Sequence, residues 1–121
     1  MNPRILLAVF ALTAALVTTA DAACARRTLR CGCWLADHLN ITGPKARKLY
    51  VARQWAHEGT PAPRGCTGCV AVFSRGRGGH VGIVKGWDAN GNPIILSDLG
   101  NGRVETIPHP KARLLALRWV S

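Results

Sequence analysis

Acidic residues are scarce in this chain. Six Asp and Glu stand against sixteen Lys and Arg, which gives a formal net charge of +10 at pH 7. Such an excess of positive charge favours an anionic partner: a cell-wall polymer, an outer membrane leaflet or a nucleic acid. The sequence carries no nucleic-acid recognition module. We therefore expect an anionic cell-wall polymer as partner, and no nucleic acid.

Internal repeats, low-complexity linkers and a second domain are lacking as well, since 121 residues suffice for one small domain. The one long apolar run, residues 5–20, is shorter than the roughly 20 residues of a membrane-spanning helix. It follows Arg4 and leads into Ala20-Asp21-Ala22, a small-x-small pattern typical of signal-peptidase cleavage. We expect residues 1–22 to be a signal peptide, with a retained short anchor as the alternative. Residues 23–121 would then form a periplasmic or secreted domain with no stable membrane insertion.

The cysteine count is odd, and all five cysteines lie in the expected mature domain. An exported protein meets an oxidising compartment, where cysteines pair or take part in chemistry. Two disulfides among Cys24, Cys33, Cys66 and Cys69 would leave Cys31 over, with three pairings open. The free thiol is then a candidate for chemistry.

Helical patterns come first along the chain and strand patterns follow. Periodicity and turn residues predict helices over residues 33–40 and 44–57, and a turn-rich connector from Thr60. They then predict strands over residues 69–73, 80–84, 93–97, 103–107 and 114–120. This order indicates an α+β fold with N-terminal helices packed on a small antiparallel β-sheet.

Cys31, His80 and Asp98 have the chemistry of a nucleophile, a base and an orienting group. Cys31 directly precedes the first predicted helix, where the helix dipole and neighbouring Arg30 favour a thiolate and a lowered thiol pKa. His80 heads a predicted strand, and Asp98 follows the next one. If these two strands form a hairpin, His80 and Asp98 lie at the same end of the sheet. Asn101 is the alternative orienting residue.

The sequence resembles the CHAP family (cysteine, histidine-dependent amidohydrolases/peptidases) and the wider NlpC-type papain-like group. The resemblance is carried by the segment Gly79-His80-Val81-Gly82-Ile83-Val84, by Cys31-Gly32-Cys33-Trp34, and by the strand Gly68-Cys69-Val70-Ala71-Val72-Phe73. It covers roughly residues 29–120 and implies a papain-like fold. It also implies a catalytic Cys31–His80–Asp98 site that hydrolyses peptidoglycan amide bonds without a metal or other cofactor. We expect the enzyme to act as a monomer.

Three alternatives use the same residues differently. Cys31 is a disulfide partner in the first. In the second, Cys31-x-Cys33 and Cys66-x-x-Cys69 bind zinc through four thiolates. In the third, the chain is a basic, disulfide-stapled wall-binding module without activity. A reactive thiol at Cys31 separates the enzyme from the module.

Overall fold

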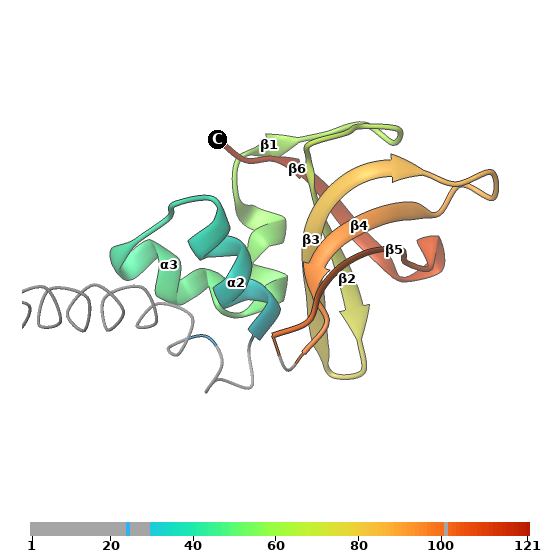
Figure 1. Ribbon diagram of the computed structural model, residues 1–121. Coiled ribbons are helices and arrows are strands. Elements are labelled where there is room, and N and C mark those ends of the chain that lie inside the picture. Colours follow the sequence, from blue (N-terminus) through green and yellow to red (C-terminus); the bar gives the residue numbers. More distant parts are fainter. Residues whose placement is uncertain (1–23, 25–29, 101) are drawn as a thin grey trace, which may run out of the picture.

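The computed structural model describes residue 24, residues 30–100 and residues 102–121. The expected signal peptide, residues 1–22, lies outside these described residues. The fold is α+β: helices cover one side of a curved antiparallel sheet (Figure 1). None of the helices in the described part of the chain is long and apolar enough to cross a membrane.

Over residues 30–100 and 102–121 the helices are α2 (Arg30–His38), α3 (Gly43–Leu49) and the 3₁₀ helices η1 (Ala52–His57) and η2 (Lys111–Arg113). The first begins three residues before the predicted start, so Cys31 lies inside its first turn. The single helix predicted over residues 44–57 is wrong, because Val51 adopts an extended conformation and separates α3 from η1. The indole Nε1 of fully buried Trp55 donates a hydrogen bond to the carbonyl of Leu49 (2.7 Å), which folds η1 back against the end of α3.

Six strands form one antiparallel sheet in the order β1-β6-β2-β3-β4-β5. Their bounds are β1 (Thr60–Pro61), β2 (Val70–Arg75), β3 (Gly78–Trp87), β4 (Pro93–Asp98), β5 (Val104–Pro108) and β6 (Leu114–Trp119). The five predicted strands are present within a few residues. The short strand β1 was not predicted, because a two-residue strand in a proline-rich connector has no periodicity to detect.

The two central strands, β2 and β3, are buried on both faces. Alternate side chains pack against the helices, where Val72 and Val81 meet Leu35 and Trp55. The remaining side chains fill the concave face of the sheet, in a second cluster of Cys66, Cys69, Ala71, Phe73, Val84, Ile95 and Leu117. Because successive residues of a strand point to opposite faces, His80 leaves β3 on the concave side.

The approach of β4 to β3 depends on Gly82. A Cβ atom at this position would lie 2.6 Å from the carbonyl oxygen of Leu96 and 2.8 Å from Cβ of Ser97, and closer still to Cγ2 of Ile95. The β3–β4 ladder starts one residue later, at Ile83 and Leu96. Gly82 thus allows the end of β4, with Ser97 and Asp98, to lie directly beside the start of β3.

We expect Gly82→Ala to lower the free energy of unfolding by about 1–3 kcal/mol, because β4 must move away from β3. Gly86→Ala is the matched control on the same strand, since its Cβ would meet only Cδ1 of Ile94 at 3.9 Å. Urea denaturation of both variants measures the difference. Equal stability of the two variants would contradict this role of Gly82.

Candidate active site

Cys31 is the free cysteine among the described residues. The other four pair as Cys24–Cys33 and Cys66–Cys69, so the expected partition into two bridges and one thiol is confirmed. Three of the four sulfurs that the zinc alternative requires are therefore in disulfides. Within the described part of the chain, no group of three or more His, Cys, Asp or Glu side chains is placed to hold a metal ion.

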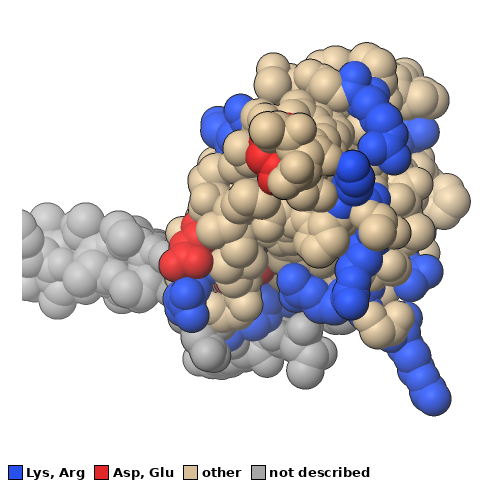
Figure 2. Space-filling model, turned by 90° about the vertical axis from the view of Figure 1, so that its right-hand side faces the viewer, with Lys and Arg blue, Asp and Glu red and all other residues tan. Residues whose placement is uncertain are grey.

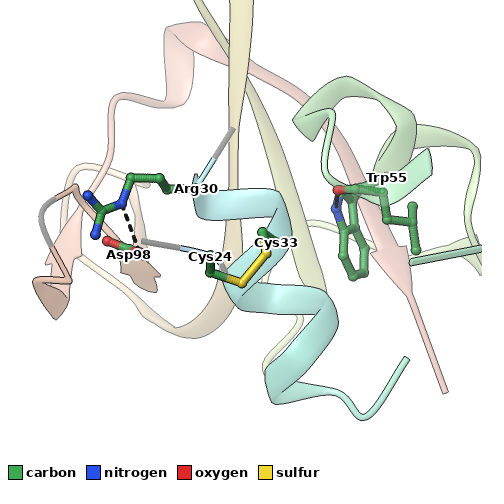
Figure 3. The surroundings of a disulfide bond; sticks show 6 residues. Cys24, Arg30, Cys33, Trp55 and Asp98 are labelled. Atoms are coloured by element: carbon green, nitrogen blue, oxygen red, sulfur yellow. Dashed lines mark hydrogen bonds and ion pairs between the residues drawn. A yellow bond between two sulfur atoms is a disulfide. The ribbon is translucent and has the colours of Figure 1, made fainter. Parts of the chain in front are cut away.

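The first turn of α2 directs its side chains to different surroundings (Figure 3). Cys33 is buried and tied to Cys24, whereas Arg30 extends toward Asp98 at the end of β4. Half-buried Cys31 lines a hollow of about 280 Å³ together with Arg30, Arg75, Gly79, Asp98, Leu99 and Gly100. This hollow places the free thiol at the junction of α2 and the β3–β4 edge.

Burial raises the pKa of the Cys31 thiol. Hydrogen bonds from the backbone N–H groups of Val81 and Gly32 and the positive charge of Arg75 act in the opposite direction, but they do not outweigh the loss of solvation. The lowered pKa expected from the helix start is thus wrong for this structure. Cys31 is a protonated thiol at neutral pH, and it lies against the backbone of Val81, the residue after His80.

His80 is almost completely buried, at 1% exposure, on the concave face. Its Nε2 lies 2.9 Å from Oγ of Ser97, and its ring stacks on that of His109, with centroids 4.9 Å apart and planes within 6°. Phe73 lies beside both histidine rings. The Nδ1 atom is buried and has no hydrogen-bond partner within the described part of the chain.

Loss of solvation lowers the pKa of His80 to about 3, and the nearby Arg75 and His109 shift it in the same direction. The imidazole is therefore neutral over the physiological range. Nε2 is engaged with Ser97, and when it donates its hydrogen to that hydroxyl, Nδ1 carries the lone pair that can accept a proton.

Asp98 does not contact His80. Its carboxylate accepts a hydrogen bond from the N–H of Gly100 (2.8 Å) and lies 3.8 Å from Nε of Arg30. The side chain that holds the imidazole is Ser97, because alternation along β4 turns residue 97 toward the concave face and residue 98 away from it. Asn101, the alternative, lies outside the described residues.

The predicted site residues thus divide between two neighbouring hollows. Cys31 and Asp98 line the first, and His80 lines a second hollow on the concave side. Arg75, at the end of β2, lines both. Across the described residues, no hydrogen bond joins the Cys31 thiol to the His80 imidazole. The catalytic roles of the three residues stay predictions.

Sequence reasoning missed Ser97 and His109. Pro-His-Pro indicates a loop, but His109 is buried, and its Nδ1 lies 3.1 Å from the carbonyl of Ile107. Ser97 follows a regular apolar alternation in β4, with Pro93 and Ile95 buried on the same face. That alternation is the one signal in the sequence for a buried hydroxyl facing the strand of His80.

Comparisons with known proteins do not extend this description. No family model, no curated protein and no solved structure matches the chain.

The raised pKa of Cys31 predicts slow alkylation at neutral pH. We expect iodoacetamide to modify the native protein at one site, several-fold more slowly at pH 7.5 than an unstructured cysteine, with a rate that still rises above pH 9. Mass spectrometry of the unreduced protein locates the adduct. A rate that already reaches its plateau near pH 6 would show a stabilised thiolate and contradict the assignment.

The lowered pKa of His80 predicts loss of stability in acid. The unfolded chain binds a proton near pH 6.5 and the native His80 only near pH 3, so stability falls as the pH decreases through this window. The full effect is on the order of 4–5 kcal/mol.

Urea denaturation between pH 7 and pH 4 measures the loss. His80→Asn should flatten the pH dependence, with a remainder from His109, whose pKa is also lowered by burial. The matched variant His57→Gln changes an exposed histidine and should leave the pH dependence as in the parent. An unchanged slope in His80→Asn would contradict a buried neutral imidazole.

Proposed function

We propose that this protein is an exported, papain-like cysteine peptidase or amidase that hydrolyses amide bonds of peptidoglycan. The observation that carries the proposal is the single free thiol of an otherwise disulfide-bonded set. It lies in the first turn of α2, in an open hollow, against the backbone of the residue next to His80. A structural cysteine in an oxidising compartment has no need to remain unpaired at such a position.

The chemistry starts from two neutral groups. His80 accepts the thiol proton of Cys31, relayed by water, at the Nδ1 atom that has no partner within the described structure. The thiolate then attacks the amide carbonyl, and the proton passes from His80 to the departing amine. Water, activated by the same imidazole, cleaves the thioester and releases the acid and the thiol.

The surroundings supply the supporting roles. Ser97 orients the imidazole through Nε2. The backbone N–H groups of Gly32 and Cys31 in the first turn of α2 point at the thiol, and they would turn to the oxyanion that forms during the attack. Asp98 acts indirectly in this scheme: it pairs with Arg30 and binds the N–H of Gly100, and so shapes the wall of the hollow.

The charge of the surface suits a wall polymer. On the face opposite the helices, Lys and Arg are spread widely while Asp and Glu occupy small areas (Figure 2). A positive surface of this kind raises the local concentration of anionic substrates. A periplasmic or secreted monomer that binds the wall by charge would need no separate wall-binding domain.

The second candidate is a non-catalytic wall-binding module. It is favoured by the raised pKa of Cys31 and by the separation of Cys31 and His80 into two hollows. Both features are unfavourable for a resting thiolate–imidazolium pair. The two candidates differ in whether any product forms.

Digestion of purified peptidoglycan by the oxidised protein, followed by mass spectrometry, tests the proposal. We expect new fragments whose masses identify the cleaved bond. Cys31→Ala should abolish them, and His80→Asn should lower the rate at least about a hundredfold, the contribution of a general base. Arg47→Gln, an exposed change on α3, is the matched control and should keep the parental rate.

The positioning role of Ser97 has its own readout. Ser97→Ala should lower kcat more than it changes KM and should shift the pH profile of kcat, because the imidazole loses its hydrogen bond. Wall binding without fragments, across several peptidoglycan chemistries, would establish the binding module instead.

A further inference from the structure

The hollow on the concave face is built from positive and aromatic side chains. It measures about 160 Å³, well above the roughly 15 Å³ that one water molecule needs. Its lining includes Arg75 from β2 and Arg113 from η2, together with the rings of His80, His109 and Phe73, which lie against one another. Every described residue that lines it is either neutral or positive.

A residue that lines this hollow has a buried polar atom without a partner. His80 is 1% exposed and lines the hollow, and its Nδ1 has no hydrogen-bond partner within the described residues. His109 donates from Nδ1 to the carbonyl of Ile107, because a carbonyl oxygen can only accept. The Nε2 atom of neutral His109 therefore carries a lone pair, and protonation of that atom would turn it into a second donor. A guest that brings negative charge would pair with the guanidinium groups of Arg75 and Arg113, and with Nε2 of His109 once that atom is protonated.

The concave hollow shares one lining residue with the hollow of Cys31. Arg75 lines both. The charge of Arg75 would therefore act on a substrate whose amide carbonyl lies at Cys31 as well as on a group bound in the concave hollow. Two guanidinium groups suit a carboxylate, which accepts paired hydrogen bonds from arginine.

We propose that Arg75, Arg113 and His109 form a subsite for a free carboxylate of the substrate peptide, which makes acidic peptides the substrate class. The proposal rests on the proposed hydrolase function. The subsite would select the substrate and assist the reaction, because a carboxylate held beside His80 also stabilises the imidazolium that forms when the Cys31 proton is transferred. A peptide amide has no carboxylate, so it lacks both the binding to the subsite and the stabilisation of the imidazolium.

The binding test needs no turnover. Cys31→Ala protein is titrated with an acetylated dipeptide that ends in a free carboxylate, with the same dipeptide as its amide, and with inorganic phosphate. The His109 and Arg113 side-chain signals are followed by NMR. We expect the acid to bind on the order of tenfold to a hundredfold more tightly than the amide.

Two charge variants and one control locate the site. Arg113→Gln and Arg75→Gln, each combined with Cys31→Ala, should remove the preference for the acid. Arg47→Gln removes one positive charge from α3 and should leave the preference for the acid unchanged. Calorimetry in buffers of different ionisation enthalpy should detect proton uptake with the acid, because its charge offsets that of Arg75 and raises the pKa of His109.

Turnover separates this proposal from the function on which it depends. Equal hydrolysis of acid and amide substrates by the parent protein would overturn the carboxylate subsite and leave the hydrolase intact. Carboxylate binding without hydrolysis of any substrate would retain the subsite and overturn the hydrolase. Phosphate binding as tight as that of the acid, or acid binding unaffected by Arg113→Gln, would overturn the peptide-carboxylate assignment.

Discussion

The contact between β3 and β4 at Gly82 determines how the candidate site is assembled. A side chain at this position would overlap the backbone of Leu96 and the side chain of Ser97. Its absence brings the end of β4 against the start of β3, so Ser97 reaches the imidazole of His80 and Asp98 reaches Arg30 on α2. Each hollow is lined by a residue held at this junction, His80 in one and Asp98 in the other.

Burial then fixes the protonation of the two central groups. Removing a thiol from water raises its pKa, and removing an imidazole lowers its pKa, so the same desolvation leaves both groups neutral. The positive charge of Arg75 acts on both groups and favours the thiolate while disfavouring the imidazolium. A neutral pair of this kind holds its proton on sulfur, so the proposed hydrolysis would need a change in the local charge before the proton moves.

The sequence predicted the order of elements well because alternation and turn residues are local signals. The helix boundary at Val51 was missed, since it depends on the hydrogen bond that Trp55 makes to Leu49 after η1 has folded back. The odd number of cysteines predicted a free thiol. The direction of the pKa shift of Cys31 could not be predicted, because the burial of the thiol depends on how α2 packs against β3.

The division of Cys31 and His80 between two hollows follows from the alternation of β3 alone. Val81 and Ile83 belong to the cluster under the helices, so His80 must face the concave side, with Phe73 and His109. The thiol reaches this strand at the backbone of Val81 and not through its side chain. In the proposed mechanism, chemistry between the two groups would have to pass the start of β3, where Arg75 lines both hollows. The charge of Arg75 acts on the thiol and the imidazole at the same time, so an anionic group bound there, as proposed, would change the pKa of both.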